Sequence, residues 1–118
     1  MPQVNSPRRN TAWYIGARSD APFQSVCEQL QTQFQLPDFE EDHEDNWVYG
    51  YAENGELGIN VARADDFKTI EKWMPGSPAG MNYQFIVYSE KGADNVLSFL
   101  KSHLHSGATL YARKNIEA

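Results

Sequence analysis

The sequence predicts an α+β fold, with a single mixed or antiparallel sheet of about five strands, two long helices and one short helix. Two segments, 23–34 and 92–106, carry apolar residues at helical spacing. Asn54-Gly55 lies between two alternating runs, which is a strong hairpin signal. The segments with the alternating or continuous apolar character of strands are 12–18, 47–52, 57–62, 83–89 and 109–113.

The expected order is strand, helix, strand, strand, short helix, strand, helix, strand, with the short helix beginning near Asp65-Asp66. Helices segregated beside a sheet that contains a hairpin favour a sandwich with right-handed crossovers, close to the ferredoxin-like arrangement plus one strand. The polar start, with Pro2 and Pro7, predicts a disordered tail over residues 1–11. Residues 12–118 are long enough for a single α+β domain with its own core.

The first long helix is expected to bury one apolar stripe. Asp20 is a candidate cap, Pro22 fits the first turn, and Pro37 ends the helix. The stripe needs an apolar surface to cover, and the aliphatic face of the hairpin is the expected one. Its members are Phe23, Val26, Cys27, Leu30 and Phe34.

The predicted hairpin separates aliphatic from aromatic side chains. A two-residue turn at Asn54-Gly55 pairs Glu53 with Glu56 and Tyr49 with Asn60. The aliphatic face is expected in the core, whereas the aromatic face is either a second buried layer or an open platform for a partner. The first face carries Val48, Gly50, Ala52, Leu57, Ile59 and Val61, and the second carries Trp47, Tyr49 and Tyr51 over Gly58, Asn60 and Ala62.

Negative charge is concentrated in one stretch. Ten acidic residues and Arg63 give residues 38–66 a charge of −9, whereas the whole chain carries −6, so the remainder carries +3. Such a run is either a solvated loop or an interaction surface with a strong field. A basic protein partner is therefore the natural expectation.

Nucleic acid and membrane partners are not expected. The run Val48-Tyr49-Gly50-Tyr51 has some likeness to the aromatic pattern on which RNA-recognition domains stack bases, but it lies among carboxylates that repel phosphates. No apolar run approaches the length of a membrane span, the start lacks the apolar segment of a signal peptide, and Cys27 is the single cysteine. These features predict a cytoplasmic protein.

No cofactor, metal or catalytic residue is predicted. His103 and His105 are two residues apart on an expected helix, so they point in different directions and do not form a zinc site. Motifs for an activated nucleophile or a phosphate-binding loop are missing from the sequence. An enzyme with scattered catalytic residues stays as an alternative.

Phe39, the acid cluster, Tyr49, Tyr51, the run 57–61 and Asp65-Asp66 together resemble immunity proteins of bacterial contact-dependent growth inhibition and related polymorphic toxin systems. The resemblance covers residues 38–110. It implies a cytoplasmic inhibitor without catalytic activity that covers the basic active site of a cognate toxin, with a nuclease as the favoured class. A small-ligand-binding module of ferredoxin-like shape is the alternative. The expected partner-binding residues are Glu40, Glu41, Asp42, Glu44, Asp45, Trp47, Tyr49, Tyr51, Glu53 and Glu56.

Overall fold

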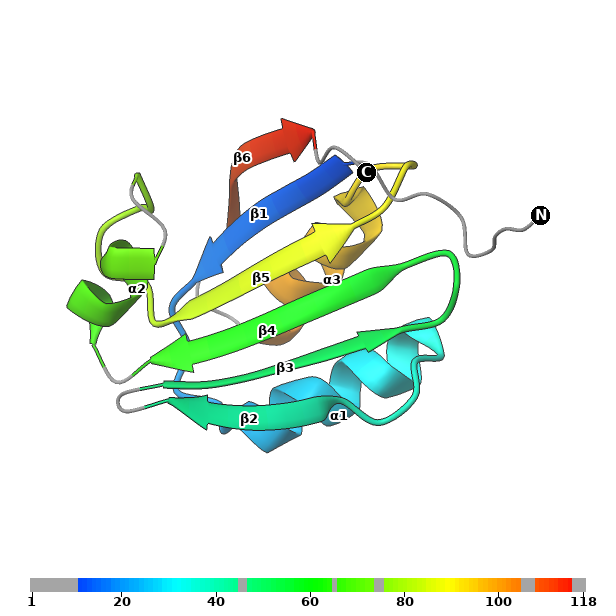
Figure 1. The fold of residues 1–118 in the computed structure, drawn as a ribbon, viewed down its shortest axis with the longest axis horizontal. Coiled ribbons are helices and arrows are strands. Elements are labelled where there is room, and N and C mark those ends of the chain that lie inside the picture. Colours follow the sequence, from blue (N-terminus) through cyan, green and yellow to red (C-terminus); the bar gives the residue numbers. More distant parts are fainter. Residues whose placement is uncertain (1–10, 45–46, 65, 74–75, 105–107, 116–118) are drawn as a thin grey trace.

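In the part of the chain that the structure describes, the fold is one antiparallel sheet of six strands with three helices (Figure 1). The computed structural model describes residues 11–44, 47–64, 66–73, 76–104 and 108–115. The strand order is β2-β3-β4-β5-β1-β6, and each neighbouring pair is antiparallel. The elements are β1 (Thr11–Ala17), α1 (Phe23–Phe34), β2 (Glu40–Glu44), β3 (Trp47–Glu53), β4 (Gly58–Ala64), α2 (Phe67–Trp73), β5 (Tyr83–Tyr88), α3 (Asp94–Leu104) and β6 (Ala108–Asn115).

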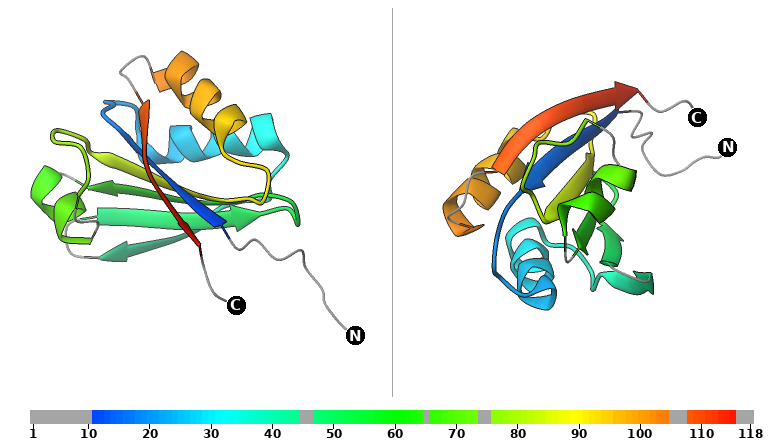
Figure 2. Two further views of the ribbon diagram at one scale, coloured as in Figure 1. Left: turned by 90° about the horizontal axis from the view of Figure 1, so that it is seen from above. Right: turned by 90° about the vertical axis from the view of Figure 1, so that its left-hand side faces the viewer.

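The two long helices lie on the same face of the sheet (Figure 2). The stripe of α1 packs against the aliphatic face of the hairpin, where Ile59 and Val61 are fully buried. Val96 and Leu100 bring α3 into the same core, and Phe34 of α1 meets Phe99 of α3 edge to face, with 5.6 Å between ring centroids. Burial of each large apolar side chain contributes about 1.5–3 kcal/mol, so this layer is the main source of stability.

The start of α1 differs from the expected one. Pro22 is the N-cap residue, with no side-chain hydrogen bond to the helix, and Asp20 does not cap it. The preceding loop is held instead by Asn82, which accepts a hydrogen bond from the amide of Ser19 (2.9 Å) and donates one to the Ser19 carbonyl (2.8 Å). Because this pair is buried, its polar groups need those partners.

The opposite face of the sheet is covered at one end by α2. Ile70 of this short helix forms a second, smaller core with Ala64 and Met81. Phe67 and Tyr111 pack against its edge. The rest of this face carries no helix among the described residues (Figure 2).

The expectation of about five strands in a ferredoxin-like variant is wrong. The additional strand is β2, whose four acidic residues and one histidine pair with β3 at one edge of the sheet. Acidic residues disfavour strands, and no alternation marks the segment. An edge strand, however, needs only main-chain hydrogen bonds to one neighbour, and all five side chains remain exposed. The segment Glu40–Glu44 of the acid run is therefore an edge strand of the sheet and not a loop.

The hairpin register is also different from the predicted one. Gly58 pairs with Glu53, and Asn60 pairs with Tyr51 instead of Tyr49, because the central turn residues are Gly55 and Glu56. The Asn54 side chain accepts hydrogen bonds from the amides of Glu56 and Leu57, both at 3.0 Å, and so takes the position before the turn. A slip of two residues leaves each side chain on its predicted face.

Several expectations fall outside the described residues. Residues 1–10 of the expected tail lie outside the described residues. Thr11, which was expected in the tail, is the first residue of β1. The expected end of the second long helix, near Ser106 and Gly107, also lies outside the described residues. This helix begins at Asp94, two residues later than expected.

Replacing Ile59 with Ala should lower the free energy of unfolding by about 2–5 kcal/mol, because it leaves a cavity between the sheet and α1. The exposed Glu56, two residues before β4, is the control, and Glu56→Ala should change stability by less than about 0.5 kcal/mol. Urea denaturation measures both values. Similar small losses for the two variants would contradict the arrangement of the hairpin under α1.

Candidate protein interface

The face away from α1 and α3 carries a continuous group of aromatic side chains. Alternate residues of β3, β5 and β1 point to this side, because the strand pairing places them opposite one another across the sheet. Each of these side chains is partly buried, and Trp47 also packs against the second core beside α2. We call this surface the open aromatic face; it consists of Tyr14, Trp47, Tyr49, Tyr51, Ile86 and Tyr88.

The rings pack in pairs. Trp47 and Tyr49 have centroids 4.8 Å apart, and Tyr51 meets Tyr88 edge to face at 5.9 Å. The Tyr51 ring crosses β4 above Gly58, where a Cβ atom would collide with the Tyr51 hydroxyl. Glycine at this position therefore allows a ring from β3 to reach β5.

The phenols of Tyr14 and Tyr88 have raised pKa values and stay neutral at physiological pH. Burial raises the pKa of Tyr88, and nearby Tyr14 and Tyr51 raise it further. Burial, followed by Tyr111, also raises the pKa of Tyr14. The face thus offers apolar rings with hydroxyl groups that can donate hydrogen bonds.

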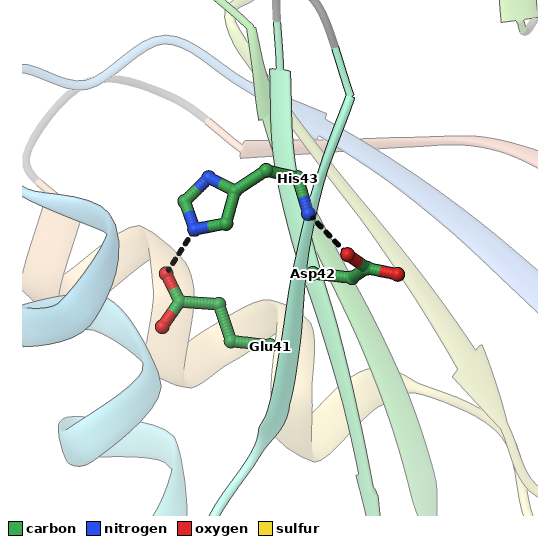
Figure 3. A network of polar contacts seen from close by, with 3 residues as sticks. All are labelled: Glu41, Asp42 and His43. Atoms are coloured by element: carbon green, nitrogen blue, oxygen red, sulfur yellow. Dashed lines mark hydrogen bonds and ion pairs between the residues drawn. The ribbon is translucent and has the colours of Figure 1, made fainter.

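The carboxylates of β2 alternate between the two sides of the sheet. Glu40, Asp42 and Glu44 are paired with Tyr51, Tyr49 and Trp47, so they lie on the side of the open aromatic face. Figure 3 shows Glu41 and His43 on the other side of the strand, where the His43 Nε2 and the Glu41 Oε2 are 3.6 Å apart. We call the first three residues the acidic row.

Tyr49 joins the acidic row to the aromatic rings. Its hydroxyl lies 3.3 Å from the Asp42 Oδ2 and 3.5 Å from the Glu44 Oε2. A phenol carries one hydrogen and donates it to one carboxylate at a time. Removal of the phenol from water raises the pKa of Tyr49 first, and the negative charges of Asp42 and Glu44 raise it further.

The charge of the acidic row is not neutralised within the described residues. No lysine or arginine there forms an ion pair with Glu40, Asp42 or Glu44. His43 lies beside Glu41, on the opposite side of the strand. Three carboxylates next to partly buried rings therefore present a negative field to solvent.

The other residues expected at a partner surface are scattered. Glu53 is exposed at the end of β3, where the Tyr51 hydroxyl approaches its Oε1 at 3.3 Å. Glu56 belongs to the hairpin turn and lines a depression on the side of the helices. Glu41 also faces that side, and Asp45 lies outside the described residues.

Tyr14, Ile86 and Tyr88 belong to the same face and were not among the expected residues. In β5 both sets of alternating side chains are largely apolar, with Gln84 as the exception. This pattern indicates a central strand without telling which face has a helix. Tyr14 joins the face only because β1 is inserted between β5 and β6. The alternation along each strand shows which of its residues share a face. The strand order is also needed to tell which faces of different strands form one surface.

Groups suited to metal or covalent chemistry are few. The described residues contain no cluster of three or more His, Cys, Asp or Glu residues that could hold a metal ion. The His103 Nδ1 lies 2.9 Å from the Phe99 carbonyl oxygen and the ring stacks on Phe99, while His105 is outside the described residues. Burial, then the charges of Glu41 and Glu28, raise the pKa of Cys27 to about 12, so this thiol stays protonated.

Comparison with family models, curated proteins and solved structures found no match for the chain. Among the described residues, no helix combines the length and apolar character that a membrane crossing requires. The geometry of the open aromatic face and the acidic row therefore carries the functional argument.

Replacing Asp42 with Asn and Glu44 with Gln together should lower the pKa of Tyr49 towards its ordinary value of 10.0, because the phenolate would lose two repulsive neighbours. An NMR titration of tyrosines labelled with ¹³C at Cζ measures this shift. Asp20→Asn with Glu71→Gln removes the same charge elsewhere and should leave Tyr49 unchanged. An unaltered pKa in the first variant would show that these carboxylates do not act on the hydroxyl.

Proposed function

We propose that this protein is a small acidic binding protein of the cytoplasm that inhibits a cognate toxin, as do the immunity proteins that it resembles. The observation that supports this most directly is the position of the acidic row beside the open aromatic face, on one side of the sheet. A nuclease is the favoured toxin class, because its substrate cleft needs cations to hold phosphates. The proposed role involves no catalytic step and no cofactor.

The acidic row would act mainly during encounter. Unneutralised carboxylates steer a basic partner and raise the association rate, and they do so less at high salt. Glu41 contributes to the same long-range field from the far side of β2, but it cannot touch a partner that covers the open aromatic face. Within β2, Glu41 can therefore contribute to electrostatic steering only, whereas the acidic row can also contact the partner.

The aromatic rings would hold the complex after encounter. Trp47, Tyr49 and Tyr51 are large, are already packed against neighbours, and lose little conformational freedom on binding. Aromatic residues at the centre of an interface often contribute about 2 kcal/mol or more each, and their loss mainly accelerates dissociation. Tyr49 is the best candidate because its hydroxyl also contacts the acidic row.

A small-ligand role is the second candidate. A depression of about 470 Å³ lies between the end of α1, the hairpin turn and the start of α3. Phe34, Leu57 and Val96 form its apolar part, and Lys91 and Asp94 are charged groups at its border. Thermal-shift screening of small molecules, followed by Phe34→Ala in the depression, tests this role independently of the toxin.

The direct test begins with the neighbouring genes. If one of them encodes a large toxin with a basic C-terminal domain, that domain is co-expressed with this protein. The protein should restore growth and, as a purified equimolar mixture, should abolish the toxin's hydrolysis of nucleic acid. An immunity protein for an unrelated toxin of similar charge is the control. Full toxicity in the presence of stoichiometric, folded protein would overturn the proposal.

The acidic row and the rings should differ in binding kinetics. Changing Glu40, Asp42 and Glu44 to Gln, Asn and Gln should lower the association rate about 10-fold or more and flatten its salt dependence. Tyr49→Ala should raise the dissociation rate roughly 30-fold, equivalent to about 2 kcal/mol. Surface plasmon resonance against the toxin domain measures both rates.

Asp20→Asn, Glu71→Gln and Asp94→Asn form the matched control, since they remove three exposed carboxylates from segments other than β2. This control should reduce the association rate less than the variant of the acidic row. If the two triple variants behave alike, only the net charge matters and the acidic row is not part of the interface.

A further inference from the structure

The two edges of the sheet differ in charge. At one edge β2 carries four carboxylates and one histidine, all exposed. At the other edge β6 carries Arg113 and Lys114, also exposed. Within the described ranges each edge strand has one neighbour in the sheet, so its outer main-chain groups have no strand partner there and can accept a further strand.

The cations of β6 lie on opposite sides of the sheet. The Arg113 guanidinium lies 5.1 Å from the centroid of the Trp13 ring, on the side of the helices, and the Lys114 ammonium lies 5.2 Å from that of Tyr14, on the open aromatic face. Leu110, in the same strand, is the one exposed large apolar side chain of the described residues. An added strand would therefore meet a cation on each side.

The strand directions allow a second copy to continue the sheet. Five successive antiparallel pairings separate β2 from β6, so the two edges run in opposite directions. A copy placed in the same orientation brings its β2 antiparallel to β6 and keeps its helices on the same side. In one register Glu41 faces Arg113 and Glu40 faces Lys114, and each pair shares a side of the sheet.

We propose that this protein associates with itself head to tail, through antiparallel pairing of β6 in one copy with β2 in the next. Pairing of β2 with β2 would oppose carboxylates to carboxylates, and pairing of β6 with β6 offers no opposite charge. The contact is heterologous, so it builds an open chain that twists with the sheet. It goes beyond toxin inhibition, and a toxin on the β2 side would compete with it.

The association is weak and depends on salt. A bulge at the pairing of Tyr14 and Ile15 with β6 limits the regular edge to its last residues, so the contact is smaller than a standard interface of about 1,600 Å². The net charge of −6 opposes it at very low salt. At about 0.1 M salt the Debye length is about 10 Å. The salt therefore weakens the repulsion between distant charges more than the attraction between paired charges on adjacent strands.

Sedimentation velocity of the full chain, up to about 1 mM protein, tests the proposal at about 0.1 M and about 1 M salt. At the lower salt concentration the weight-average sedimentation coefficient should rise with protein concentration. At the higher salt concentration it should stay at the value of the monomer. Glu40→Gln with Glu41→Gln, and separately Arg113→Gln with Lys114→Gln, should each remain monomeric. Lys68→Gln with Lys101→Gln is the control for the second variant and should assemble like the parent protein.

Mixing the two monomeric variants is the decisive step. The variant with Glu40→Gln and Glu41→Gln retains a functional β6, and the variant with Arg113→Gln and Lys114→Gln retains a functional β2. An equimolar mixture should therefore form heterodimers and no larger assembly. Assembly of either variant alone would instead show a symmetric contact through its intact edge. A parent protein that stays monomeric under all conditions, or a mixture that does so, would overturn the proposal.

Concentration-dependent NMR shifts of the parent protein provide a second measurement that needs no variant. They should appear on both β2 and β6, and shifts confined to one edge would contradict head-to-tail pairing. The variant with Arg113→Gln and Lys114→Gln keeps the acidic row, so it should still protect against a toxin. Loss of self-association with intact protection therefore separates this inference from the proposed function.

Discussion

Both long helices pack against one face of the sheet, and the remaining structure depends on this one-sided burial. The aliphatic residues of β3 and β4, together with Phe85 and Val87 of β5, are covered by α1 and α3 and form the main core. The other face has only α2 at one end among the described residues. Because the core is complete on one side, the aromatic residues opposite are free to serve another purpose.

Aromatic residues suit a face without a helical cover. Their rings cover one another, as Tyr51 covers Gly58 and meets Tyr88, so much of their apolar area leaves water even without a second layer. Their hydroxyl groups remain able to bond to water or to a partner. A face built from leucine or valine would expose apolar area without that compensation.

The edges of the sheet show how charge and backbone pairing interact. Carboxylates along β2 prevent this strand from pairing with its own copy, which protects an exposed edge from aggregation. Under the two proposals, the same carboxylates would attract the cations of a toxin or those of β6 in another copy. The same row of charges can therefore prevent pairing with an identical strand and favour binding to a basic partner.

The sequence by itself determined which side chains share a face, because alternation along a strand survives a register error of two residues, as at Asn54 and Gly55. It also determined the stripe of α1, because helical spacing is a local property. The tertiary structure alone decided that the charged segment of β2 forms a strand, since its pairing comes from the backbone of β3. It also brought Tyr14 and Tyr88 beside Tyr51, because strand order depends on contacts between segments distant in the chain.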